Sequence, residues 1–199
     1  LAGFNPFVVI QSPNNRSFVV KSKYCNSYVI LDSDESIIDF LLSYQVNSKV
    51  VLFSCSDTLA RLFDLNYNLL RGKYIIQNCC DRQGQLAYWM DKDRMLEKAK
   101  ECGLTIPMSY SINLDKSNDY SKTIFPCLIK PKVSATGSKK IFRICYNLKE
   151  LESAINEIRS ICSKVLIQEY IQSDYEYLIY GLSTGNEICM PGELTKIHT

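Results

Sequence analysis

The amino-acid sequence predicts an α/β protein, with a Rossmann-like unit over residues 1–90 followed by a smaller α+β unit. In the first part of the chain, short apolar runs alternate with amphipathic stretches. A capped, amphipathic stretch beginning at Asp91 then separates the two parts. Beyond it, two apolar runs flank a loop of small residues and are followed by an amphipathic stretch and a further apolar run. This order favours a sheet unit, a helical connector and a second sheet unit.

Three runs in the first part are rich in β-branched residues and nearly continuous, as is typical of strands that are buried on both faces. They are FVVIQ (7–11), KVVLFSC (49–55) and KYIIQNC (73–79). Two amphipathic helices are predicted between them, over residues 32–44 and 56–65, because apolar residues recur there at helical spacing. The candidate N-caps are Asp32 or Ser33 for the first helix and Ser56 or Asp57 for the second. Strand, helix, strand, helix in this order predicts a parallel, doubly wound sheet.

The second part begins with a helix that Asp91 can cap, that Gly103 ends and that Pro107 prevents from restarting. A polar loop follows over residues 113–122. The later elements are a hairpin over 125–144, a helix over 148–161 with a capping pattern of Asn147 and Glu150, a strand over 164–170, and a hairpin of YEYLIYG and EICMPGEL around the turn STGN.

The composition limits the classes of function. With 23 Lys and Arg against 21 Asp and Glu, the net charge of +2 is too even for a general nucleic-acid-binding protein. The sequence has 9 cysteines without a CxxC pair and a single histidine, His198, which argues against a zinc site and indicates reduced thiols in a cytoplasmic protein.

No stretch reaches the roughly 18 apolar residues of a membrane helix. The sequence lacks an initiator Met and stops abruptly at Thr199, so we expect a fragment at both ends.

Lys130 is the first candidate binding residue, because it ends an apolar run in FPCLIKP and is followed by the loop SATGSKK. A cation at the end of a buried strand is costly unless it meets an anion, and the backbone of such a loop can surround phosphate oxygens. Taken alone, however, Lys130 is better explained by a surface hairpin whose lysine reaches solvent. The loop is not a Walker loop, and no GxGxxG is present, which disfavours an NAD-binding protein.

The run VLIQEYIQSDYEY supplies groups of another kind. A strand that leaves one subunit and crosses to another exposes the backbone carbonyl of Glu169 and the amide of Ile171, which suit an adenine edge, and Glu176 can accept ribose hydroxyls. The alternative is a plain linker with solvated acids. Lys92, at the start of the connecting helix, can hold a phosphate if it faces inward, and is otherwise a solvated lysine.

In this order, these pieces resemble the ATP-grasp superfamily, and within it ligases similar to the carbamoyl-phosphate synthase large subunit and to D-aspartate ligase. The resemblance runs from about Ser22 to the last residue and is carried by KSKYC with VVLFSCSDTLARL, DK with GLTIP, FPCLIKP, GSKKI and VLIQEYIQSDYEY. It implies a Rossmann-like pre-ATP-grasp domain (1–90), a helical connector (91–110), the α+β nucleotide-binding lid half of an ATP-grasp domain (111–170) and the start of the C-terminal sheet (171–199).

Carried over residue by residue, the resemblance assigns Lys92 and Lys130 to the phosphates, Thr136, Gly137 and Ser138 to the loop over them, the backbone of Glu169 and Ile171 to adenine, and Glu176 to ribose. Lys140 stands where relatives usually have a glycine. The resemblance also implies Mg²⁺, whose acidic ligands are expected beyond residue 199, so the chain alone is not expected to complete a reaction.

The implied function is the ATP-binding part of an ATP-dependent carboxylate–amine ligase, or a ligase like carbamoyl-phosphate synthase, acting through an acyl phosphate. The implied partners are ATP, a small-molecule carboxylate, and an amine or another nucleophile. Nucleic acid and membrane are not expected, and a homodimer is possible. The alternative is a non-catalytic nucleotide-binding or protein-interaction module with the same shape.

Overall fold

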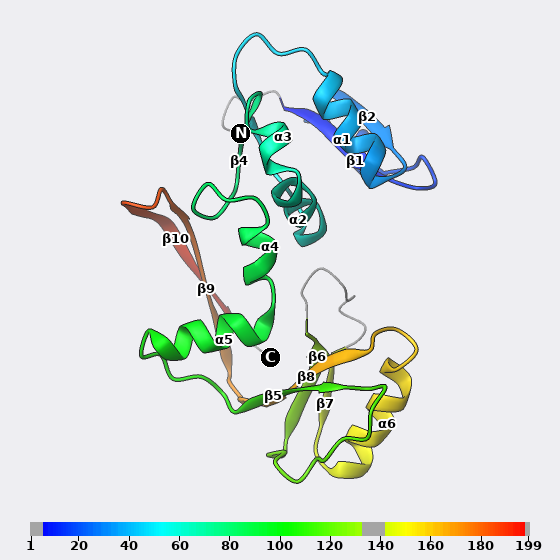
Figure 1. Ribbon diagram of the computed structural model, residues 1–199, viewed down its shortest axis with the longest axis vertical. Helices are drawn as coiled ribbons and strands as arrows, with labels where there is room; N and C mark the ends of the chain where they lie inside the picture. Colours follow the sequence, from blue (N-terminus) through cyan, green and yellow to red (C-terminus); the bar gives the residue numbers. More distant parts are fainter. Residues whose placement is uncertain (1–5, 133–141, 198–199) are drawn as a thin grey trace. The chain divides into compact units, whose positions relative to one another are not determined.

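The computed structural model describes residues 6–132 and 142–197. The chain divides into two compact units, Leu1–Leu86 and Ala87–Thr199 (Figure 1). Each unit is described by itself below. No helix within the described ranges combines the length and the hydrophobicity needed to cross a bilayer.

The first unit is built on two parallel strand pairs. Its strands are β1 (Phe7–Gln11), β2 (Ser27–Leu31), β3 (Val50–Leu52) and β4 (Tyr74–Ile76), and its helices are η1 (Phe18–Lys21), α1 (Asp34–Ser43), α2 (Asp57–Leu65), α3 (Tyr67–Leu70) and the beginning of α4 (Gln85–Trp89). β1 pairs with β2 and β3 pairs with β4, both in parallel. The parallel pairing agrees with the predicted α/β class, whereas a single doubly wound sheet is not confirmed.

Local side-chain chemistry explains where the first two helices begin. The hydroxyl of Ser33 accepts a hydrogen bond from the Ser36 amide, and that of Ser56 accepts one from the Leu59 amide. Of the two candidates for each helix, the serine is therefore the N-cap. The apolar faces of these helices and of α3 pack with β4 in one core, formed by Ile37, Ile38, Leu41, Phe63, Tyr67, Leu70, Tyr74 and Ile76.

The second unit contains a four-stranded antiparallel sheet. Its elements are α5 (Lys92–Glu101), β5 (Ser109–Asn113), β6 (Cys127–Pro131), β7 (Arg143–Cys145), α6 (Leu148–Ile158) and β8 (Lys164–Glu169). The strand order is β5-β8-β6-β7, so β8 lies between β5 and β6 although it follows both in the sequence. The sequence pattern predicted β6, β7, α6 and β8 but not β5.

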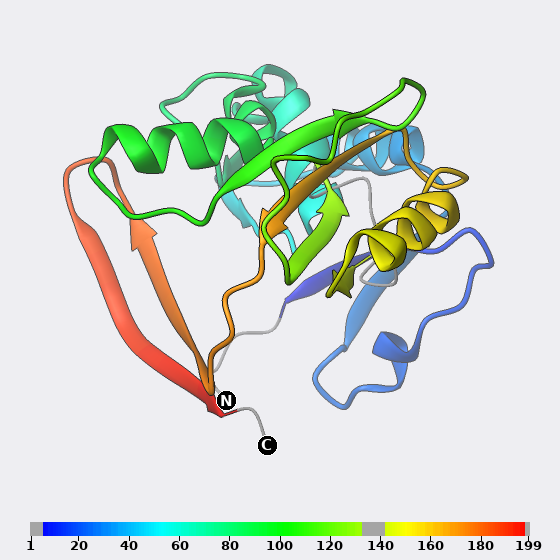
Figure 2. The ribbon, with the colours of Figure 1, turned by 90° about the horizontal axis from the view of Figure 1, so that it is seen from below.

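α6 packs on one face of this sheet (Figure 2). Its buried residues are Leu151, Ala154, Ile155 and Ile158, which recur at helical spacing. They meet inward-facing residues of the strands, including Ile129 and Ile167, whose side chains are 0% and 1% exposed. This core holds the strands that carry the candidate site.

The chain ends in an antiparallel hairpin of β9 (Tyr175–Ser183) and β10 (Ile188–Ile197). The turn is closed by a hydrogen bond from the Thr184 amide to the Glu187 carbonyl at 3.0 Å. Gly185 has φ of 90°, a left-handed conformation that glycine adopts without steric cost. The predicted hairpin around the turn STGN is therefore present.

Candidate functional site

The first turn of α5 is attached to the residue that follows β6. Asp91 caps the helix, since its carboxylate accepts hydrogen bonds from the amides of Asp93 at 3.0 Å and Arg94 at 3.4 Å. The amide of Lys92, the first helical residue, donates to the carbonyl of Lys132 at 3.2 Å. Lys132 itself donates its amide to Lys164 at 3.3 Å, which continues the pairing of β6 with β8. Lys92 is thus tied to the end of the strand that carries Lys130.

The side chain of Lys132 strengthens this attachment. Its Nζ lies 2.6 Å from Oδ2 of Asp93 and 3.7 Å from Oδ2 of Asp91. The other carboxylate oxygen of Asp93 accepts a hydrogen bond from the hydroxyl of Ser111, in β5, at 2.7 Å. The hydrogen bond to Asp93 is the main reason why the pKa of Lys132 is raised above its ordinary value. Both acids of the helix start are therefore engaged by Lys132.

Lys130 lies in β6, two residues before Lys132, which follows the end of the strand. Its Nζ donates to Oε1 of Gln168, in the neighbouring strand β8, at 2.7 Å. Gln168 is 8% exposed. The pKa of Lys130 is lowered, first by burial and second by the positive charge of Lys92. The charge of Lys92 thus acts on Lys130, and both residues are predicted from sequence as phosphate ligands.

Two lysines that repel each other are suited to an anion. Burial penalises the charge of Lys130, and Lys92 adds to this penalty. A group with several negative oxygens between or beside the two ammonium groups would offset both costs. The arrangement can therefore hold a phosphate or a similar oxyanion.

The end of β8 offers backbone groups. The amide of Glu169 donates to the carbonyl of Met108 at 2.8 Å, and the amide of Met108 donates to Oε2 of the Glu169 carboxylate at 3.2 Å. The amide of Tyr170 donates to the carbonyl of Pro126 at 3.0 Å. Ile171 follows the strand with 59% of its side chain exposed.

The remaining predicted residues are placed less completely. Glu176 lies near the start of β9, with its Cα in register with that of Lys196. Thr136, Gly137 and Ser138, together with Lys140, lie outside the described residues. The roles predicted for these residues stay predictions.

The described residues do not form a metal centre. Within 6–132 and 142–197, no three side chains of His, Cys, Asp or Glu come together in a way that could hold a metal ion. The Mg²⁺ that the family resemblance implies does not fit any group of residues in this part of the chain. No step below is assigned to it.

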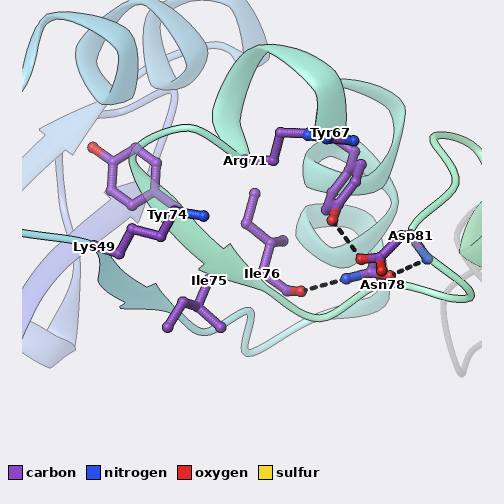
Figure 3. Close-up of a pocket in the computed structure, with 8 residues that line it drawn as sticks. All are labelled: Lys49, Tyr67, Arg71, Tyr74, Ile75, Ile76, Asn78 and Asp81. Atoms are coloured by element: carbon purple, nitrogen blue, oxygen red, sulfur yellow. Dashed lines mark hydrogen bonds between the residues drawn. The ribbon is translucent and has the colours of Figure 1, made fainter. Parts of the chain in front are cut away.

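The first unit contains a cavity of about 340 Å³ that the sequence did not predict (Figure 3). It is lined by Lys49, Tyr67, Arg71, Tyr74, Ile75, Ile76, Asn78 and Asp81. The phenol of Tyr67 donates to Asp81 at 2.8 Å, and this hydrogen bond is the largest cause of the raised pKa of Tyr67. The guanidinium of Arg71 lies 5.8 Å from the centre of the Tyr67 ring. Figure 3 shows Lys49 beside Tyr74, on the side opposite Asp81.

Four residues of the lysine site were missed from the sequence: Lys132, Asp93, Ser111 and Gln168. The alternation of lysines at 130 and 132 and of acids at 91 and 93 is visible in the sequence. A spacing of two places residues on one side of a strand but not of a helix, and it does not show that the lysines and the acids meet. That information comes from the contacts of Lys132 with the start of α5.

No protein-family model matches this chain. Two curated relatives are similar to it. Formate-dependent phosphoribosylglycinamide formyltransferase of Wolinella succinogenes is 30% identical over 106 residues, which are 49% of this chain and 27% of that protein. The enzyme of the same name from Prochlorococcus marinus is 30% identical over 99 residues, covering 48% and 25%. The chain thus spans about a quarter of the length of the curated relatives it matches.

Solved structures are similar over most of the chain. L-amino acid ligase from Bacillus licheniformis has a TM-score of 0.67 at 14% identity. The similar region covers 99% of this chain and 45% of the ligase. An N5-carboxyaminoimidazole ribonucleotide synthetase in complex with ADP has a TM-score of 0.68 at 11% identity, covering 97% and 48%. D-alanine–D-alanine ligase from Bacillus anthracis has a TM-score of 0.55 at 14% identity, covering 86% and 60%. At these identities the likeness establishes the fold.

Proposed function

On the premise that this chain has the fold of the ATP-grasp ligases, which its structural neighbours share, we propose that it forms the ATP-binding part of an ATP-dependent carboxylate–amine ligase. The observation that carries the proposal is that Lys130 is held in β6 by Gln168 at 2.7 Å, with its pKa lowered first by burial and second by the charge of Lys92. These lysines bind the phosphates of ATP. Residues Thr136, Gly137 and Ser138 form the loop over the phosphates.

Adenine binds at the end of β8. The Glu169 carbonyl accepts a hydrogen bond from the adenine amino group. The end of β8 is held in place by the Glu169 amide, which donates to the Met108 carbonyl at 2.8 Å. The amide of Ile171, two residues further on, donates to the adenine ring. Glu176 accepts hydrogen bonds from the ribose hydroxyls. The base and the phosphates then lie at the two ends of a site built on β6 and β8.

In the proposed reaction, an oxygen of the carboxylate substrate attacks the γ-phosphorus of ATP. The bond between that phosphorus and the β–γ bridging oxygen breaks, which gives an acyl phosphate and ADP. The amine then attacks the acyl carbon, loses a proton and displaces inorganic phosphate. Lys92 and Lys130 offset the negative charge on the phosphates during the first step.

The named properties of similar proteins support this proposal. One solved structure of the Bacillus anthracis ligase is a complex with ATP, and it covers 97% of this chain with a TM-score of 0.58 at 14% identity. The synthetase structure contains ADP. The curated relatives are formate-dependent, and formate is a carboxylate.

The test is calorimetric binding of ATP, ADP and AMP to the full-length protein and to two variants. Lys130→Met keeps the aliphatic stem and removes the charge, so ATP affinity should fall by about tenfold or more while AMP affinity changes little. Glu176→Ala should weaken ATP and AMP equally, since both carry ribose.

The matched control is Lys98→Met, which removes another lysine charge from the second unit. Lys98 pairs with Glu101 on the exposed side of α5, and its loss should leave all three affinities unchanged. Unchanged ATP affinity in both Lys130→Met and Glu176→Ala would overturn the site. ADP formation that depends on an added carboxylate distinguishes a ligase from a non-catalytic nucleotide-binding module.

A further inference from the structure

We propose that Lys132 is a positioning residue of this nucleotide site, which ties the start of α5, with Lys92, to the end of β6 and keeps the carboxylate of Asp93 away from Lys92 and Lys130. The inference rests on the proposed function, because it concerns how the two phosphate-binding lysines are arranged. Lys132 itself makes no contact with the nucleotide in this scheme.

The backbone contacts show how Lys132 fixes the position of Lys92. The Lys132 carbonyl accepts the Lys92 amide at 3.2 Å, and the Lys132 amide donates to Lys164 of β8 at 3.3 Å. One residue therefore joins the start of α5 to the sheet that contains Lys130. Lys132 directly follows Pro131, the last residue of β6, and so lies two residues beyond Lys130.

The side-chain contacts show how Lys132 controls the acids. Asp91 and Asp93 flank Lys92 in the sequence, so either carboxylate could form an ion pair with a phosphate-binding lysine. Instead, Asp93 uses one oxygen for Lys132 at 2.6 Å and the other for Ser111 at 2.7 Å, while Asp91 lies 3.7 Å from Lys132.

The three side chains of this ion-pair cluster are 25%, 19% and 29% exposed for Lys132, Asp91 and Asp93. Screening by water is therefore weaker than for pairs on an open surface. Without the Lys132 cation, the Asp93 carboxylate would turn to Lys92 and Lys130 and compete with the phosphates, whereas Asp91 is held by the amides that it caps. Lys132 thus allows the acidic residues at the start of α5 to lie next to a site for an anion.

The experiment compares single and double variants of the full-length protein by calorimetry with ATP and AMP. Lys132→Met should weaken ATP binding by about tenfold, which corresponds to about 1.4 kcal/mol, and AMP binding much less. Lys132→Arg, which keeps the charge, should bind ATP nearly as well as the wild type. If Lys132→Met does not fold, Lys132→Gln lacks the charge but can still donate to Asp93, and it carries the same expectation.

The decisive measurement is rescue. Adding Asp93→Asn to Lys132→Met removes the competing carboxylate charge and retains an oxygen that can accept from Ser111, so ATP affinity should return most of the way to the wild-type value. A purely structural role for Lys132 would not be rescued, because the double variant has lost both partners of the ion pair. Absence of rescue would overturn the inference.

The two proposals fail differently. If Lys130→Met and Glu176→Ala both leave ATP binding unchanged, the nucleotide site itself is wrong. If Lys130→Met weakens ATP binding but Lys132→Met does not, the site stands and the positioning role of Lys132 is wrong.

Discussion

Lys130 and Lys132 lie two residues apart, yet their pKa values shift in opposite directions. Burial and the charge of Lys92 lower the pKa of Lys130, whereas the hydrogen bond to Asp93 raises that of Lys132. The charge of Lys130 thus costs stability at neutral pH, and that cost falls as the pH rises through its lowered pKa. The stabilisation by Lys132 is present below the pKa of an unfolded lysine and is lost as the pH rises through its raised pKa.

The lowered pKa of Lys130 predicts a pH dependence of ATP binding. Phosphate attracts only the protonated lysine, so affinity should fall between neutral pH and the ordinary lysine pKa of about 10.4, earlier than an ordinary lysine would allow. Calorimetry over that range measures the effect. A Lys130→Arg variant stays charged throughout and should lose most of the decline. An equal decline in that variant would show that another group titrates.

The thiols of Cys127 and Cys145 face each other in register across β6 and β7. Burial, with the neighbouring Cys145, raises the pKa of Cys127 to about 12, and burial also raises that of Cys145. Because the thiolate is the reactive form, both should resist an alkylating reagent at pH 8 until the protein unfolds. Exposed Cys55 and Cys102 should react first, and mass spectrometry of the labelled peptides gives the order.

At the scale of single elements, local signals were predicted well. Asp91 and Asn147 were expected to cap their helices from the sequence alone, and both side chains accept amide hydrogen bonds from the first turn. A cap depends on residues within three positions of each other, which a sequence displays directly. The start of a helix is therefore easier to predict than the identity of its neighbours.

The cap of α6 can be tested by one substitution. The Glu150 amide donates to Oδ1 of Asn147 at 3.0 Å, and the Glu150 carboxylate accepts from the Tyr146 amide at 2.9 Å. Asn147→Ala removes the first of these contacts and should lower the free energy of unfolding by about 1 kcal/mol. Urea unfolding measures the change, and Asn147→Asp, which can still accept the amide, should cost much less.

The sequence pattern did not predict β5, because the residues of this strand carry no clear strand signal. β5 has the sequence SYSIN, in which only Ile112 is buried, and it becomes a strand because β8 pairs with it over Ser109–Asn113. In the same way, Lys92 and Lys130 could be named as separate candidates, whereas the role of Lys132 needed the distance to Asp93. The residues of the site were thus partly predictable, but the charges that surround them were not.

At the scale of the whole chain, each unit has its own core. The core of the first unit lies within residues 37–76 and that of the second within residues 112–167, with no residue in common among those described. The burial that stabilises one unit is therefore supplied by its own part of the chain.

Paired core substitutions test this separation. Leu151 and Leu70 are each 0% exposed, one in each core. Leu151→Ala should lower the free energy of unfolding of residues 87–199 by about 2–5 kcal/mol and speed hydrogen exchange of the β8 amides, while the β4 amides keep their protection. Leu70→Ala should show the reverse pattern. A loss of protection in both units from either change would contradict the prediction.

The position of β8 in the sheet has a consequence for the newly made chain. During synthesis, β5, β6 and β7 leave the ribosome before β8, yet β8 is the strand that lies between β5 and β6. The four-stranded sheet therefore stays open until the chain has been made through Glu169. The same late insertion brings Gln168 to Lys130. The sheet and the surroundings of Lys130 both need β8, so neither can be complete in the nascent chain before that strand has been made.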